Sequence, residues 1–199
     1  MVDVTKIKTL FPELTDMVPE DLSALAEYFE SVSLLSAKKL NLEFNNKDMN
    51  HAAIVMSTIF QTAEKNIKIF AGNFKGNICD KEIYLNSLNS AVSNNKEICV
   101  VFEGSPNKDS KCLKMLIDQK SKGKNISIKI LSKDFVSKLN KMTDGGVNHF
   151  TVADNRMFRY ETDMISFKAF CNFDDEKIGT ILDNNFTVLQ RESIDYPIN

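Results

Sequence analysis

Residues 148–161, with the sequence NHFTVADNRMFRYE, bring together the residue types of nucleophilic and acid–base chemistry. His149 is one of only 2 histidines in the chain, and Asp154, Arg156 and Arg159 follow it closely. An imidazole acts as a nucleophile or general acid when a carboxylate orients it, and an arginine can hold an anionic substrate. The stretch therefore predicts either a catalytic centre or an ordinary β-hairpin that carries a histidine.

The hairpin interpretation rests on the turn chemistry in the middle of this stretch. Asp154 and Asn155 are typical turn residues, and short apolar segments lie on both sides of them. Residues two apart on a strand share a face, so Arg159 and Glu161 can pair with each other. Such surface pairs are usually worth ~0–1 kcal/mol and are weak evidence for a function. In this interpretation His149 is a hydrogen-bonded hairpin residue.

Alternating helical and strand patterns lead up to the hairpin and predict an α/β fold. Amphipathic helices are expected at 51–65, 81–92 and 111–123, with Asp80 capping the second and Gly123 closing the third. The segments IKIFAG, ICVVFEG and SIKIL are the intervening strands, and the continuous apolar run of the second is typical of a central parallel strand. This order predicts βαβ units and a mostly parallel central sheet flanked by helices. After the hairpin, ISFKAFCNF predicts a strand and DDEKIGTILDNNF a helix.

The N-terminal part is expected to form a short helical extension. Pro19 marks a helix start that continues to about residue 35, and LNLEF at 40–44 alternates like a strand. The polar residues 45–50 are the best candidate for a domain joint. We therefore expect an extension at 1–46, a main domain at 47–190 and a tail at 191–199.

Composition limits the classes of function. The 199 residues are 43% hydrophobic, which is enough for a core, and the net charge of −2 gives no global reason to expect nucleic acid. Any such site would be a local patch. Lys120, Lys122 and Lys124 form the one local basic cluster, which is either a solvated turn or a patch for a phosphate backbone.

The 4 cysteines are scattered through the chain, two of them in apolar runs, and are expected to be buried reduced thiols. Their spacing, like that of the histidines, predicts no metal site, and the absence of a glycine-rich phosphate loop predicts no nucleotide cofactor. No leader or membrane-spanning segment is expected. These patterns predict a cytoplasmic protein that does not contact a membrane.

From about residue 50 to residue 187, the order of elements resembles one half of a phospholipase D-like domain. HFTVADNRMFRYE falls where that family carries its H-x-K-x4-D signature, and AFCNF falls where it carries G-S-x-N. The resemblance implies that two halves pair, within one chain or as a homodimer. One histidine then becomes a phosphohistidine, the other acts as general acid, and no metal is needed.

The signature is matched only in part. His149 matches the histidine, but Thr151 stands at the lysine position and Arg156 at the aspartate position. Asp154 replaces the aspartate only if the hairpin is two residues shorter. Asn172 matches the last residue of G-S-x-N, whereas its glycine and serine are missing.

Two hypotheses follow from this partial match. In the first, the protein is a catalytically degenerate subunit that binds a partner protein or nucleic acid and self-associates or docks on a larger partner, as in a defence assembly. Thr151, Asp154 and Asn172 then form a polar pocket beside His149. In the second, it is a homodimeric, metal-independent phosphodiesterase or nuclease that uses His149, with Arg156 or Arg159 replacing the lysine. We favour the first hypothesis, because the loss of the lysine cation should cost several kcal/mol of transition-state stabilisation. The loss of a single oxyanion donor already costs ~3–4 kcal/mol.

Overall fold

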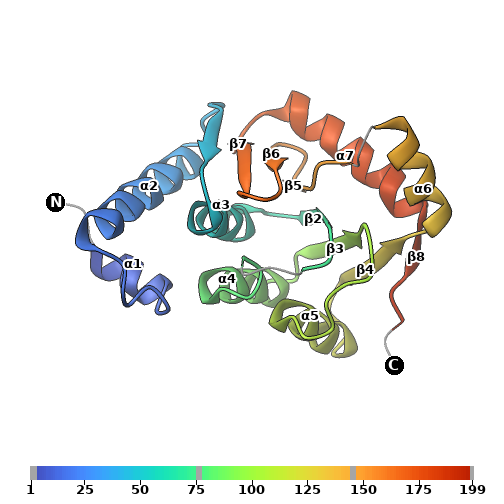
Figure 1. The fold of residues 1–199 in the computed structure, drawn as a ribbon, viewed down its shortest axis with the longest axis horizontal. Helices are drawn as coiled ribbons and strands as arrows, with labels where there is room; N and C mark the ends of the chain where they lie inside the picture. Colours follow the sequence, from blue (N-terminus) through green and yellow to red (C-terminus); the bar gives the residue numbers. More distant parts are fainter. Residues whose placement is uncertain (1–3, 75–77, 144–146, 198–199) are drawn as a thin grey trace.

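The computed structural model describes residues 4–74, 78–143 and 147–197 (Figure 1). Its helices are α1 Val4–Leu10, α2 Pro19–Ala37, α3 Met49–Thr62, α4 Glu82–Ser93, α5 Lys111–Ser121, α6 Lys133–Met142 and α7 Glu176–Arg191. Its strands are β1 Phe44–Asn46, β2 Asn66–Ala71, β3 Glu97–Phe102, β4 Ile126–Leu131, β5 Phe150–Ala153, β6 Met157–Asp163, β7 Lys168–Asn172 and β8 Ser193–Asp195. All of these strands join one sheet in the order β1-β7-β6-β5-β2-β3-β4-β8.

The sheet is mixed, which corrects the prediction of a mostly parallel sheet. Only the β2–β3 and β3–β4 pairs are parallel, and the other five pairs are antiparallel. The helical crossovers α4 and α5 return the chain to the same end of the sheet, as the alternating pattern predicts. The short turns between β5, β6 and β7 reverse the chain instead, so those strands pair antiparallel. The α/β class is confirmed, with β3 in the predicted central parallel position.

Helices cover both faces of the sheet and create two apolar layers (Figure 1). The larger layer lies under α3, α4 and α5, and α2 packs on the outer side of α3. The smaller layer lies under α6 and α7, with Phe150, Phe158 and Phe186 among its buried side chains. Because side chains alternate along each strand, β5 and β6 send one set of residues into each layer. This alternation decides which hairpin residues can meet.

The N-terminal segment joins this core. α2 begins at Pro19 as predicted, but the predicted strand at 40–44 is mostly wrong, because only Phe44 belongs to β1. Leu40 and Leu42 are 41% and 55% exposed, so their alternation does not reflect burial against a sheet. The sheet continues across both expected domain boundaries, since β1 pairs with β7 and β8 pairs with β4. The division into domains stays a prediction.

Local turn chemistry explains most of the element ends. Asp154 and Asn155 have φ values of 52° and 57°, which are typical of the predicted two-residue hairpin turn. Gly123 has a φ of +82° just beyond α5, as expected for a helix-closing glycine. The predicted cap on α4 is wrong. Asp80 accepts hydrogen bonds from the Ser110 hydroxyl and the Cys112 amide, so it supports the start of α5 instead.

The four cysteines are buried and free, as predicted, and burial raises the pKa of the Cys79 thiol to about 12. Within the described residues, no cluster of three or more histidine, cysteine or acidic side chains could hold a metal ion. No helix in the same part of the chain combines the length and apolar character needed to cross a membrane.

Candidate functional site

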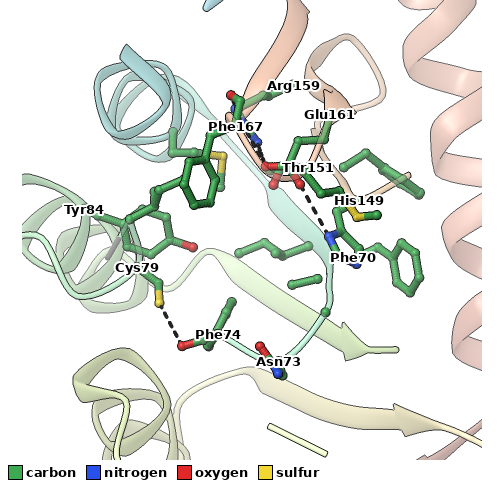
Figure 2. Close-up of a pocket in the computed structure, with 17 residues that line it drawn as sticks. Phe70, Asn73, Phe74, Cys79, Tyr84, His149, Thr151, Arg159, Glu161 and Phe167 are labelled. Carbon is green, nitrogen blue, oxygen red and sulfur yellow. Dashed lines mark hydrogen bonds and ion pairs between the residues drawn. The ribbon is translucent and has the colours of Figure 1, made fainter. Parts of the chain in front are cut away.

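A cavity of about 200 Å³ opens where β2 ends, beside β5 and β6 (Figure 2). Most of its lining is apolar or aromatic; the charged side chains lie on the hairpin side, whereas Asn73 and Tyr84 lie away from it. The lining residues are Met56, Ile69, Phe70, Ala71, Gly72, Asn73, Phe74, Ile78, Cys79, Tyr84, His149, Phe150, Thr151, Arg159, Glu161, Met164 and Phe167. Carboxyl ends of parallel strands are the usual ligand sites of open α/β sheets. The cavity is therefore the candidate functional site.

His149 stands at this site between two carboxylates. Its Nε2 lies 3.3 Å from Oε2 of Glu103, which follows β3, and its Nδ1 lies 3.4 Å from Oε2 of Glu161 on β6. The backbone amide of Glu161 also donates to the His149 carbonyl, so the pair is fixed across the hairpin. Both ring nitrogens therefore face acceptors, an arrangement that suits a doubly protonated imidazolium.

Electrostatics favour the charged form of this pair. Burial lowers the pKa of His149, but Glu161 and Glu103 outweigh burial and leave the pKa above its ordinary value. Burial likewise raises the pKa of Glu161, yet His149 and Arg159 bring the net pKa below its ordinary value. Near neutral pH, Glu161 is therefore a carboxylate, and the ring of His149 is biased towards the imidazolium.

Arg159 forms the buried floor of the polar side. Its guanidinium donates twice to Oε1 of Glu161 at 3.1 Å, as the shared strand face predicted. It also donates to Oδ1 of Asn46 at 2.9 Å and to the carbonyl of Phe167 at 2.9 Å. The Asn46 amide donates to the same carbonyl. The ion pair is thus tied to β1 and to the turn between β6 and β7.

Two hydroxyls remain open on the cavity wall. Thr151 lies between Ile69 and Arg159 in the sheet and is only 3% exposed. Tyr84 reaches in from α4 on the opposite side, next to Phe167 in the view of Figure 2. Neither hydroxyl has a hydrogen-bond partner among the residues that the structure describes. They are the polar groups left available to a ligand.

Three of the predicted residues in the hairpin and the strand after it do not line this cavity, and neither do the three predicted lysines. Asp154 accepts from the amides of residues 64–66 at 2.6–3.0 Å, which ties the hairpin turn to the start of β2. Arg156 pairs with Asp174 at 3.1 Å near the same turn. Asn172 lies opposite Phe158 in the sheet, on the other face from Arg159, and donates to Asn41. The structure therefore brings together His149, Thr151 and Arg159, and separates the rest.

The basic cluster lies at the other end of the parallel strands. Lys120 lies in the last turn of α5, and Lys122 and Lys124 follow the helix just before β4 begins, whereas the cavity lies where β2 ends. Lys122 pairs with Asp118 at 2.6 Å, and Lys124 donates to the Asn95 side chain. The cluster is thus separate from the cavity and partly neutralised.

Several residues that line or flank the cavity were not predicted from the sequence. Glu103 directly follows the apolar run of β3, and the rule that ligands bind at strand carboxyl ends could have singled it out. Tyr84 and Phe167 carry no such local signal, because only the tertiary fold brings them to the cavity. His51 is a residue of the first turn of α3, as expected, and its ring packs 4.0 Å from that of Tyr28.

The chain has a phospholipase D-like α/β fold. Among solved structures, it superposes on TrmBL2, an archaeal chromatin protein described with a novel mode of DNA binding, with a TM-score of 0.57 and 11% identity. That match covers 89% of this chain and 64% of TrmBL2, so the chain spans just under two thirds of that protein. It also superposes on Nuc, a phospholipase D family member from Salmonella typhimurium, with a TM-score of 0.56 and 11% identity over 79% of this chain and all (100%) of Nuc.

NucT from Helicobacter pylori gives a similar result, with a TM-score of 0.54 and 11% identity over 78% of this chain and 100% of NucT. No protein-family model and no curated protein matches the sequence. At these identities the similarity shows the fold alone, so the function has to be inferred from the site.

Proposed function

We propose that the protein is a catalytically inactive phospholipase D-like domain that works through binding. The observation that carries this proposal is that both ring nitrogens of His149 face carboxylates, at 3.3 and 3.4 Å. A phosphohistidine requires one unprotonated nitrogen that points at the phosphorus. Glu103 and Glu161 would instead keep both ring nitrogens of His149 protonated. Their negative charges would also repel an anionic phosphodiester.

The spacing of the signature supports the same conclusion in either alignment. With His149 as the family's histidine, Thr151 takes the lysine position. With Asp154 as the family's aspartate, His149 itself takes the lysine position and Val147 the histidine position. In both alignments the histidine–lysine pair is incomplete.

Hydrolysis of bis-p-nitrophenyl phosphate and of DNA in EDTA tests the loss of catalysis. We expect no turnover above the buffer background, and no difference between the wild-type protein and His149→Ala. EDTA-resistant cleavage that disappears in a folded His149→Ala protein would overturn the proposal and establish the phosphodiesterase alternative. Cleavage that is equal in both proteins would rule out His149 as the nucleophile, but it would contradict the expected absence of turnover.

Nucleic acid is the partner class that we propose to test first, because the fold is shared with a DNA-binding chromatin protein. Lys120, Lys122 and Lys124 are the proposed contacts for the phosphate backbone. Fluorescence anisotropy with labelled DNA and RNA at low salt should show binding that weakens steeply as salt rises.

Replacing Lys120, Lys122 and Lys124 by glutamine should weaken the binding of nucleic acid. The matched triple replacement of Lys133, Lys138 and Lys141 on α6 should not. Equal binding by both triple variants, or none by the wild type, would rule out this patch.

Self-association is the second part of the proposal and rests on the pairing of halves in the family. Sedimentation velocity over a range of protein concentrations should show a dimer. A species that stays monomeric at the highest concentration would contradict self-association and leave docking on a larger partner.

A further inference from the structure

The charges in the cavity neutralise one another. Arg159 is paired with Glu161, which also faces His149, and the second nitrogen of His149 faces Glu103. No lysine lines the cavity in the described part of the chain. Among the described residues that line the cavity, a phosphate or carboxylate would therefore meet the Glu161 carboxylate and no open cation. A ligand for this cavity should be uncharged.

The walls of the cavity suit the flat faces of a ring. Tyr84 and Phe167 lie on one side and Phe74 on another, while Thr151 faces them from the hairpin (Figure 2). Aromatic walls stack on planar molecules, whereas a polyol would need many more polar partners than the open hydroxyls of Thr151 and Tyr84. The open hydroxyls thus meet a ligand from the hairpin side and from the α4 side.

The backbone at this wall is strained. Phe74 and Phe167 both have positive φ values, 55° and 59°, which are rare for bulky residues and tend to occur at functional sites. The Phe167 carbonyl is held by Arg159 and by Asn46, at 2.9 and 2.5 Å. The same polar network that neutralises the cavity therefore fixes the aromatic wall in place.

We propose that this cavity binds an uncharged, planar, ring-sized molecule, such as a nucleobase, whose polar groups hydrogen-bond to Thr151 on the hairpin side and to Tyr84 on the α4 side. The volume of about 200 Å³ accommodates one ring system but not a large ligand. This inference rests on the proposed function, because it replaces phosphodiester chemistry with recognition of a neutral ring. The base could be a free molecule or part of a nucleic acid.

Titration of the ¹⁵N-labelled protein in NMR spectra tests the proposal with adenine and uracil as probes. A ligand of this size is expected to bind with a Kd on the order of millimolar, which chemical-shift titration can measure. We expect the amides of Thr151 and Phe167 to shift in a saturable way. Inorganic phosphate and glucose serve as the anionic and polyol comparisons and should leave these amides unchanged.

Two variants remove one hydroxyl each and leave the cavity otherwise intact. Thr151→Val and Tyr84→Phe should each weaken base binding roughly five-fold, the loss expected for one hydrogen bond. Thr58→Val removes a buried hydroxyl on α3 that bonds its own helix, and Tyr160→Phe removes one on the other sheet face. Both controls should bind the bases as the wild-type protein does.

The outcomes test the pocket independently of the loss of catalysis. They also distinguish a free base from a base within a nucleic acid. Binding of a short oligoadenylate that weakens in Tyr84→Phe indicates a base within a nucleic acid, and binding of adenine alone indicates a free molecule. Phosphate or glucose shifting these amides, no base doing so, or equal base binding by the hydroxyl variants would overturn the pocket proposal. None of those results affects the expected absence of hydrolysis, which only the EDTA assay decides.

Discussion

The α-carbon of Gly72 lies directly against the imidazole of His149. A Cβ atom added at position 72 would stand 2.9 Å from Cε1 and 3.3 Å from Nε2 of that ring. Because Gly72 follows β2 while His149 precedes β5, the contact joins the two strands at the cavity. The absence of a side chain at Gly72 is what lets the ring lie between Glu103 and Glu161.

Gly72→Ala should push His149 out of this position. Overpacking of this kind usually costs about 1–3 kcal/mol of the free energy of unfolding, which urea denaturation can measure. Gly104→Ala is the matched control, because a Cβ there meets nothing within 4 Å. If both variants had the same stability and the same His149 chemical shifts, the close packing described for Gly72 would be wrong.

The stability that His149 contributes should depend on pH in a defined direction. Its pKa is raised in the folded protein, so its contribution is fully present below the unfolded value of about 6.5 and is lost as the pH rises through the folded pKa. The pKa of Glu161 is lowered, so its contribution is present above about 4.5 and is lost as the pH falls through its folded pKa. The difference in unfolding free energy between wild type and His149→Gln should therefore be largest between about pH 4.5 and 6.5.

His51 provides the internal control for this prediction. Burial lowers the pKa of His51, and the nearby Asp48 offsets burial only in part, so this shift is opposite to that of His149. NMR titration of the two rings, assigned with His51→Gln, should give the higher pKa for His149. The reverse order would mean that the carboxylates do not hold the His149 ring as described.

Much of the fold, but less of the site, could be predicted from the sequence. Apolar periodicity located β3 and the crossover helices, because burial on one or two faces leaves a local pattern. Parallel pairing was overestimated because the hairpin strands, β1, β7 and β8 join the same sheet as antiparallel neighbours, and short turns require such partners. The segment at 40–44 alternates like a strand, yet Leu40 and Leu42 are exposed because no layer covers them.

Most of the site residues that could be predicted belong to the same hairpin. Thr151, Arg159 and Glu161 meet at the cavity through hairpin register, which the period of two makes readable. Asp80 shows why other assignments failed: its sequence position favours a cap on α4, but a tertiary contact with Ser110 takes its carboxylate. Glu103 could have been singled out at the end of β3, but Tyr84 and Phe167 reach the cavity only through the tertiary fold, which no local pattern predicts.

Gly179 should be intolerant of the substitution that usually stabilises a helix. Replacing a helical glycine by alanine normally gains about 1 kcal/mol. In α7, however, a Cβ at Gly179 would lie 2.3 Å from the carbonyl oxygen of Asn155 in the hairpin turn. We expect Gly179→Ala to destabilise the protein by about 3 kcal/mol or more, measured by urea denaturation against Gly104→Ala. An unchanged or raised unfolding free energy would contradict the close approach of α7 to the turn.

Replacing Arg159 should lower the free energy of unfolding far more than replacing Arg156 at the hairpin turn. Arg159→Met leaves Glu161 without its buried partner, a change that usually costs about 3–5 kcal/mol. Arg156→Met is the matched control, because the pair of Arg156 with Asp174 is only partly buried and such pairs near the surface are worth about 0–1 kcal/mol.

Glu161→Gln in the Arg159→Met background should recover part of the lost stability, because no unpaired carboxylate then remains. The double-mutant cycle should therefore give a coupling energy above about 1 kcal/mol between Arg159 and Glu161, measured from urea unfolding of the four proteins.

The pKa of His149 reports on the same network independently. Its pKa should fall when Glu161 becomes glutamine and rise when Arg159 is replaced, because Arg159 competes for the same carboxylate. Additive stability changes together with an unmoved His149 pKa would show that the three side chains do not act as one network.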